Sequence, residues 1–324
     1  MISSVDDTYL NGKLFASIAL DLFLKQYEEN AVYKAYVDAL HILPQKVHSL
    51  TDIPFLPVSF FKTHQVVCGN TLPDFYFESS STTGQQPSRH YIADIKLYET
   101  SLLKGFEERY GSPENYVLLA LLPSYLERKN ASLVYMAEWL MKKSGHPTNG
   151  FYLYEQEKLK DTLLSLEAQK QKTLLLGVTF ALLDTAELYE MDLQHTIVME
   201  TGGMKGRKQE QTREEVHSFL KKRWNLKSVH AEYGMTELLS QAYSKGGGIF
   251  TPASSMKLWV RDMNDPFDIK SSGIGYLNII DLANIHSCSF IATEDIGRLH
   301  EDGRFEVLGR MDHSALRGCS LMTA

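Results

Sequence analysis

Two hydrophobic periodicities alternate along residues 91–230, and this alternation is the strongest constraint on the fold. Short apolar runs at residues 116–122, 173–179 and 195–199 have the length and composition of buried strands. Residues 130–143 and 211–223 carry a helical pattern between them. Strands that alternate with helices are typical of layered α/β folds with a parallel sheet. The sequence therefore predicts an α/β fold around a largely parallel core.

The two ends of the chain have a different texture. Residues 14–40 place apolar side chains at Phe15, Ile18, Leu22 and Tyr27, a spacing that predicts one amphipathic helix. After three consecutive glycines at 246–248, the runs at 255–260, 275–280 and 305–308 predict strands. We therefore expect one core over residues 1–308, with a β-rich lobe at about 249–308. Residues 309–324 are predicted to be a hinge remnant and tail.

Composition excludes several classes of protein. The chain has 324 residues, 44% hydrophobic content and a net charge of −7, which predicts a large core and no nucleic-acid partner. No apolar run reaches the ~18–20 residues that span a bilayer, so no membrane span is expected. Acidic residues near the start argue against a secretory signal. Three widely spaced cysteines exclude a disulfide framework and fit a cytoplasmic protein.

A dense run of small hydroxylated residues follows the aromatic segment at residues 74–77. Its members are Ser79, Ser80, Ser81, Thr82, Thr83 and Gly84. Hydroxyls and backbone N–H groups packed this closely suit phosphate oxygens, although an ordinary turn can have the same composition. The run lacks the lysine and spacing of a Walker loop.

Two later blocks carry matching chemistry. The first is Tyr233-Gly234-Met235-Thr236-Glu237, in which a tight turn precedes a hydroxyl for phosphate and a carboxylate for Mg²⁺. The second pairs Asp295, at the end of one strand-like run, with Arg310 after another. Such a pair could hold a ribose diol from two sides.

In order along the chain, these blocks resemble the motifs of the adenylate-forming superfamily, which includes acyl-CoA synthetases, adenylation domains and luciferases. Residues 79–89 match the phosphate loop, with Ser81 in place of a glycine and one extra residue before Pro87. Residues 233–237 match the Y-G-x-T-E block without departure. Residues 293–298 match the ribose block, with Glu294 in place of a glycine, and residues 309–312 match the hinge block. Four ordered blocks are far more specific than one.

A narrower resemblance is to bacterial acyl-protein synthetases and their phenylacetate-CoA-ligase-like relatives. It rests on residues 53–62, residues 200–205 and residues 317–320. The implied fold is the large N-terminal domain of the adenylate-forming fold, made of layered α/β lobes and a small β-rich lobe, with the C-terminal lid domain absent. The implied reaction is ATP-dependent activation of a carboxylic acid, fatty or aryl, as an acyl-adenylate.

The resemblance also implies roles for individual residues. Ser80 to Gly84 would hold the β- and γ-phosphates of ATP, and Thr236 would hold the α-phosphate. Glu237 would bind Mg²⁺, and Tyr233 and Gly234 would complete that turn. The adenine would lie on the backbone of Gly202 and Gly203. Asp295 and Arg310 would hold the ribose.

The end of the chain departs from the superfamily pattern. Relatives continue into a lid whose lysine contacts the reacting carboxylate, and we expect this chain to lack that lid. A substitute cation, Lys205 or Arg317, would then be required. Cys319 matches the cysteine that carries the acyl group in acyl-protein synthetases, and Arg317 could lower the pKa of its thiol. The alternative for Cys319 is a cysteine without a role in the tail.

Three functions remain open at this point. The enzyme could pass the acyl group to Cys319 and then to a partner such as a fatty-acyl reductase or an acyl carrier protein. It could instead be an acyl-CoA ligase that uses coenzyme A. The third possibility is a non-catalytic nucleotide-binding homologue, against which the intact block at residues 233–237 argues. The aromatic run at residues 150–154 fits either the border of an acyl pocket or ordinary packing, and the sequence leaves the oligomeric state open.

Overall fold

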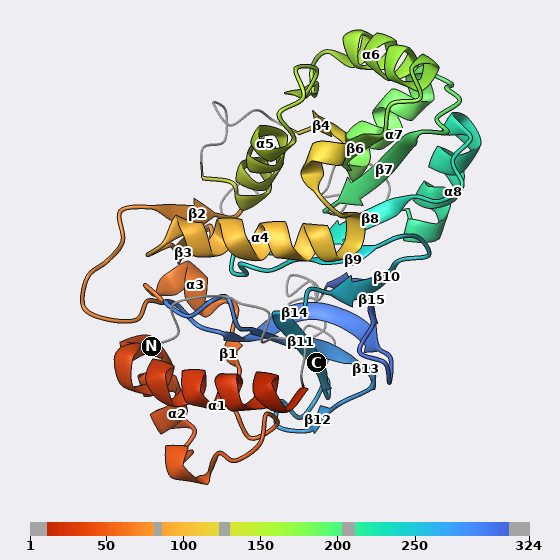
Figure 1. Ribbon diagram of the computed structural model, residues 1–324. Helices are drawn as coiled ribbons and strands as arrows, with labels where there is room; N and C mark the ends of the chain where they lie inside the picture. Colours follow the sequence, from red (N-terminus) through yellow and green to blue (C-terminus); the bar gives the residue numbers. More distant parts are fainter. Residues whose placement is uncertain (1–11, 81–85, 123–129, 203–210, 311–324) are drawn as a thin grey trace, which may run out of the picture.

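The computed structural model describes residues 12–80, 86–122, 130–202 and 211–310. Within them, one sheet of 13 strands runs through the molecule in the order β12-β11-β13-β14-β15-β10-β9-β8-β7-β6-β4-β5, with β1 paired to β14 (Figure 1). The strands β4 to β8 pair in parallel, and β8 to β15 pair antiparallel. The predicted α/β class is therefore confirmed, and a single sheet joins its parallel and antiparallel parts.

The parallel part of the sheet is covered by helices on both faces. Alternate residues of β4 face opposite ways: Leu118 and Ala120 pack with α4 and α5, whereas Leu119 and Leu121 pack with α6 and α7. This alternation follows from the two-residue repeat of a strand. The elements are α4 (Ile95–Tyr110), β4 (Val117–Leu121), α5 (Ser132–Ser144), β5 (Gly150–Phe151), α6 (Gln156–Ala168), β6 (Thr173–Val178), α7 (Thr179–Leu188), β7 (Thr196–Thr201), α8 (Arg213–Trp224) and β8 (His230–Tyr233).

The antiparallel part begins where the sequence changes texture. Its strands are β9 (Ala242–Ser244), β10 (Ile249–Pro252), β11 (Met256–Arg261), β12 (Ile269–Lys270), β13 (Gly273–Asp281), β14 (Phe290–Leu299) and β15 (Phe305–Arg310). The remaining elements are α1 (Gly12–Glu29), α2 (Ala31–Ala39), β1 (Leu56–Pro57), α3 (Phe60–Thr63), β2 (Tyr76–Glu78), β3 (Arg89–Tyr91) and the short 3-10 turns Pro44–Lys46 and Pro113–Asn115.

The prediction of one helix over residues 14–40 is wrong, because the chain breaks at Asn30. The Asn30 side chain accepts a hydrogen bond from the Tyr33 N–H and so caps a second helix, α2. Asn30 Nδ2 also donates to the Ser287 carbonyl at 3.0 Å. The two helices pack on the antiparallel strands through Phe23 and Tyr33, whose rings both contact Phe290. Helical periodicity continues across the break because both helices cover the same apolar surface.

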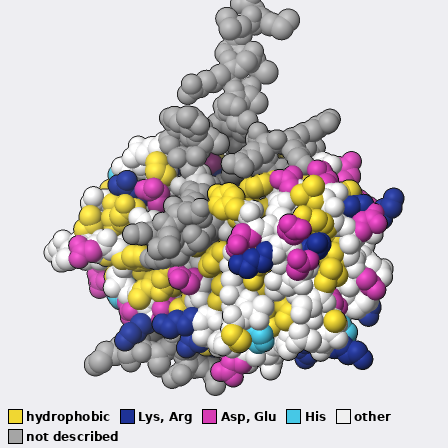
Figure 2. Space-filling view, turned by 90° about the horizontal axis from the view of Figure 1, so that it is seen from above, with side chains coloured by type: hydrophobic (Ala, Val, Ile, Leu, Met, Phe, Trp, Pro, Cys, Tyr) yellow, Lys and Arg dark blue, Asp and Glu magenta, His cyan; other side chains and the backbone are white. Residues whose placement is uncertain are grey.

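The surface combines both signs of charge. Figure 2 shows Lys and Arg side chains lying among Asp and Glu side chains over much of the face seen from above. Among the helices in the described ranges, none is long and apolar enough to cross a membrane.

Candidate nucleotide and acyl site

The predicted site residues divide into those that the structure describes and those that lie outside it. Outside the described residues are Ser81, Thr82, Thr83, Gly84, Gly203, Lys205, Arg317 and Cys319. Of the others, Ser79 and Ser80 follow β2, Tyr233 ends β8, and Asp295 and Arg310 lie in β14 and β15. Gly202 follows β7, and the turn from Gly234 to Glu237 follows β8, which pairs with β7 in parallel. Such carboxyl edges are where open α/β sheets bind ligands.

Tyr233, Asp295 and Arg310 come together although they are far apart in the sequence. The Tyr233 hydroxyl donates to Asp295 Oδ2 at 2.9 Å. Asp295 lies directly opposite Arg310 in the β14–β15 pair, and Arg310 Nε is 3.6 Å from Asp295 Oδ1. Glu294, the residue that departs from the family pattern, also faces Arg310, at 3.7 Å. A carboxylate and a guanidinium thus lie side by side at the predicted ribose position.

Ser88 connects the start of the hydroxylated run to Glu237. The backbone N–H of Ser88 donates to Ser79 Oγ at 2.9 Å, and the Ser88 side chain bonds the Glu237 carboxyl group. Glu237 is 5% exposed, and this burial raises the pKa of its carboxyl group. The next residue, Arg89, pairs with Glu78 across the β2–β3 hairpin at 2.8 Å. Sequence reasoning missed Ser88, although it lies inside the matched block.

Two buried side chains hold the turn after β8. Asp281 accepts from the N–H groups of Leu239 and Ser240 at 2.7 and 3.0 Å. Asn284 Nδ2 donates to the Glu237 carbonyl at 2.9 Å and to the Cys288 carbonyl at the same distance. These contacts fix the backbone that carries Thr236 and Glu237. No local motif announces them, because Asp281 and Asn284 lie more than 40 residues further along the chain.

His90 also supports this turn. Its Nδ1 lies 2.9 Å from the Thr236 carbonyl oxygen, and its Nε2 lies 3.0 Å from Asn284 Oδ1. Burial lowers the pKa of His90 to about 4, against the opposing effect of these two contacts. Both neighbours accept hydrogen bonds, so a neutral ring with one N–H satisfies one of them.

Glu200 joins the strand edge beside Gly202 to the antiparallel lobe. Glu200 Oε2 accepts from the Thr179 hydroxyl at 3.1 Å, and Thr179 also donates to the Gly202 carbonyl at 2.9 Å. Glu200 Oε1 accepts from Arg213 Nε at 3.0 Å and lies 3.1 Å from His217 Nε2. Burial opposes ionisation, but the contacts with His217 and Arg213 lower the pKa of Glu200 below its ordinary value. Arg213 also donates to the Val307 carbonyl of β15 at 3.2 Å.

The residues present fit a Mg²⁺ ion that is held by a single carboxylate. In the described ranges, no group of three or more His, Cys, Asp or Glu side chains could enclose a metal ion. Mg²⁺ commonly uses only one or two carboxylates and takes its other ligands from phosphates and water. Glu237, buried beside the predicted phosphate loop, fits that single-carboxylate pattern.

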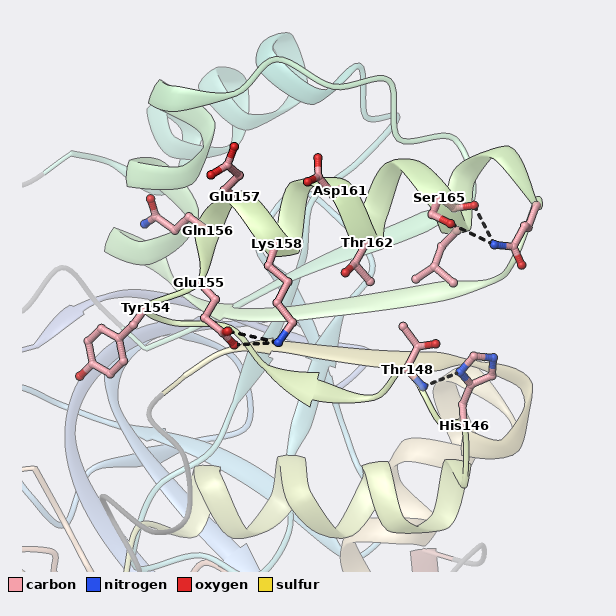
Figure 3. A pocket seen from close by; sticks show the side chains of 12 residues that line it. His146, Thr148, Tyr154, Glu155, Gln156, Glu157, Lys158, Asp161, Thr162 and Ser165 are labelled. Atoms are coloured by element: carbon pink, nitrogen blue, oxygen red, sulfur yellow. Dashed lines mark hydrogen bonds and ion pairs between the residues drawn. The ribbon is translucent and has the colours of Figure 1, made fainter.

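A surface groove lies away from these residues. It has a volume of about 780 Å³ and runs along α6, where its lining includes His146, Tyr154, Glu155 and Lys158 (Figure 3). Tyr154 is 77% exposed, and Lys158 pairs with Glu155 at 3.1 Å. Tyr154, from the aromatic run at residues 150–154, lines this groove, but none of the residues predicted to bind ATP or Mg²⁺ does, and its side chains are those of a solvated helix surface. We therefore assign the chemistry to the strand edge and not to this groove.

The comparison with protein families decides the identity of the chain. The family model described as acyl-protein synthetase, LuxE, matches residues 6–324. The chain belongs to the LuxE acyl-protein synthetase family. A comparison with curated protein sequences found no match. The narrower resemblance predicted from the sequence is thereby confirmed.

Several solved structures share the fold of this LuxE-family chain, although their sequence identity to it is low. ATP-bound MatB from Rhodopseudomonas palustris is 19% identical, with a TM-score of 0.54 over 74% of this chain and 49% of its own. An ATP-bound chimera, RpMatB-BxBclM B3, is 18% identical, with a TM-score of 0.55 over 75% and 49%. An open 2-hydroxyisobutyryl-CoA ligase in complex with 2-HIB-AMP and CoA is 12% identical, with a TM-score of 0.67 over 93% and 75%.

These likenesses show the fold. The LuxE-family chain spans about half the length of the two MatB-type chains. It has the layered α/β fold of adenylate-forming ligases, as the sequence predicts.

Proposed function

We propose that this LuxE-family chain activates a carboxylic acid with ATP and transfers the acyl group to a thiol. The observation that carries this proposal is the convergence of Tyr233, Asp295 and Arg310 beside Glu237. The first three would hold the ribose, and the turn after β8 would face the phosphates. The acid, fatty or aryl, would enter at the same strand edge.

In the first step, an oxygen of the carboxylate attacks the α-phosphorus of ATP, and the bond to the β-phosphate oxygen breaks. Acyl-AMP and pyrophosphate result. A carboxylate is a poor electrophile, so this exchange supplies a good leaving group. Thr236 would hold the α-phosphate. The run from Ser79 and Ser80 to Gly84 would hold the β- and γ-phosphates. Mg²⁺, bound through Glu237, would neutralise phosphate charge. The protein's part is positioning and electrostatic stabilisation.

In the second step, a thiolate attacks the acyl carbonyl carbon, and the C–S bond replaces the bond to AMP. We propose Cys319 as this thiol, with onward transfer to a reductase or an acyl carrier protein. Its position lies outside the described residues, so the support is the sequence match at residues 317–320. Lys205 or Arg317 would supply the cation that faces the reacting carboxylate.

Acid-dependent exchange of labelled pyrophosphate into ATP, over a panel of acids, tests the first step. Exchange that needs both an acid and Mg²⁺ is expected. The coenzyme A alternative is separated by the acceptor: an acyl-CoA product with no acyl adduct on the protein would favour coenzyme A. Absence of exchange with every acid, in a chain that still binds ATP, would favour the non-catalytic homologue.

A further inference from the structure

Three buried polar side chains lie on one face of the sheet beside the turn after β8. They are Glu232 in β8, Tyr243 in β9 and Gln241 just before β9, with exposed fractions of 8%, 2% and 4%. We call them the acceptor cluster. Glu232 and Tyr243 are direct partners across the antiparallel β8–β9 pair, so their side chains share a face. Gln241, two residues before Tyr243, points the same way.

Polar atoms of the acceptor cluster lack partners. Within the part of the chain that the structure describes, neither Gln241 Oε1 nor Tyr243 Oη has a hydrogen bond. Glu232 Oε2 accepts from the Thr201 hydroxyl at 2.5 Å, which leaves Oε1 turned toward Gly234. Buried polar atoms almost always have partners, and unpaired ones in a native protein call for a specific explanation.

Gly234 places the acceptor cluster directly against the proposed phosphate turn. A Cβ atom added at Gly234 would lie 2.5 Å from Glu232 Oε1 and 3.5 Å from Gln241 Cγ. Gly234 is two residues before Thr236, the proposed α-phosphate contact. An acyl chain whose carboxylate lies at the α-phosphate would therefore reach these atoms within a short distance.

The side chains packed around the acceptor cluster are apolar and aromatic. Tyr243 packs edge-on against Phe106 and Tyr110 at ring distances of 6.3 and 5.5 Å. Leu118, Leu176 and Met199 belong to the same core cluster. Three polar groups in such surroundings are costly for a plain hydrocarbon chain, because it would leave them unpaired. A hydrogen-bond donor on the chain would pair with them.

We propose that the acid activated by this chain carries a hydroxyl or ammonium group on its chain, and that Gln241, Tyr243 and Glu232 bind that group. Gln241 Oε1 and Glu232 Oε1 accept from the donor, and the Tyr243 hydroxyl accepts or donates. The inference rests on the proposed function for the position of the carboxylate. It adds a specificity that the family match does not contain.

The test compares acids of equal chain length that are unsubstituted, hydroxylated or aminated, in the full chain with ATP and Mg²⁺. Pyrophosphate exchange gives kcat/KM, and thermal shift gives binding without catalysis. We expect the hydroxy or amino acid to be preferred at least about tenfold, since sites built for a hydrogen bond reject analogues that lack it. The better of the two identifies the donor as hydroxyl or ammonium.

Variants tie the preference to the acceptor cluster. Gln241→Leu should abolish the preference, mainly by raising KM for the substituted acid. Tyr243→Phe should lower the preference without loss of thermal stability, because the lost hydroxyl has no partner in the described fold. Gln169→Leu, an exposed polar-to-apolar change at the C-terminal cap of α6, is the matched control and should change neither value.

The outcomes separate the inference from the proposed function. Exchange with unsubstituted acids that equals or exceeds exchange with substituted ones, unaffected by Gln241→Leu, would overturn the inference and leave acyl activation intact. A cluster that binds only a buried water would give this result. Binding of the substituted acid that depends on Gln241, with no exchange for any acid, would keep the inference and remove acyl activation.

Discussion

The Tyr233 hydroxyl donates to Asp295 Oδ2 at 2.9 Å, and this bond joins two sequence blocks that lie 62 residues apart. Tyr233 belongs to the block that ends β8, and Asp295 to the block in β14. The contact orients the Asp295 carboxylate through Oδ2, whereas Arg310 Nε approaches the other oxygen, Oδ1. The predicted ribose site therefore depends on a residue assigned to the phosphate turn.

Removing either partner should weaken ATP binding to different degrees. Asp295→Ala deletes both acceptor oxygens for the ribose and should weaken binding by about 1–3 kcal/mol. Tyr233→Phe removes only the bond that orients Asp295 and should cost about 0.5–1.5 kcal/mol. Titration calorimetry measures both values. Tyr27→Phe, which loses a surface bond to Asp38, should bind ATP like the parent chain. Equal ATP affinity in Asp295→Ala and the parent would remove the ribose assignment.

Glu237→Gln should reduce acyl-adenylate formation more than ATP binding. Neutralising this carboxylate weakens the hold on Mg²⁺, which matters most as charge redistributes over the phosphates. Pyrophosphate exchange and ATP calorimetry on the same preparation give the two effects. Glu306→Gln serves as the control. It lies in β15 and alters the ion pair with Arg298 and the contact with His300 Nε2. Exchange at the parent rate in Glu237→Gln would show that Glu237 is not the metal carboxylate.

Glu232 should make the free energy of unfolding depend on pH. Burial raises the pKa of Glu232 to about 7 from its ordinary value of 4.5. Between these values the folded state holds a proton that the unfolded state has lost, so stability falls as pH rises from 4.5 to 7. The whole fall corresponds to at most about 3.4 kcal/mol. Urea unfolding at a series of pH values should show a smaller fall in Glu232→Gln. An identical fall in both proteins would assign the effect to other groups.

Arg213→Ala should destabilise the fold by about 1–3 kcal/mol, because Glu200 is buried and would lose a charged donor. Arg304→Ala, which removes an exposed pair with Asp302, should cost under about 1 kcal/mol. Urea denaturation compares the two. Equal losses would mean that the contact between Arg213 and Glu200 contributes no more than a surface pair.

Cys319 should carry the acyl group transiently. Intact-mass measurement should find an acyl adduct that needs both ATP and acid and that hydroxylamine removes, as expected of a thioester. A thiol held near the anhydride has a high effective concentration. Cys319→Ser should retain pyrophosphate exchange and lose onward transfer. An equal adduct on Cys319→Ser would place the acyl group elsewhere.

Local sequence patterns predicted the strands and helices well where apolar periodicity was strong. The run at residues 116–122 became β4, and residues 211–223 became α8, whose capping box joins Thr212 and Glu215. The site was predictable only through motif residues such as Tyr233 and Asp295. The supporting side chains were not, since Asn284 acts through contacts with residues that lie far away along the chain.

The docking of α1 and α2 has a consequence for protein synthesis. Gln26 bonds Asn284 and Ser289, and Asn30 bonds Ser287, across separations of 257 to 263 residues. At a translation rate of ~5–20 residues per second, these partners leave the ribosome roughly 13–53 s after the helices do. During that interval the apolar side chains of Phe23 and Tyr33 have none of their Phe290 contacts. The nascent N-terminal helices are therefore a natural substrate for chaperones until the last strands of the sheet emerge.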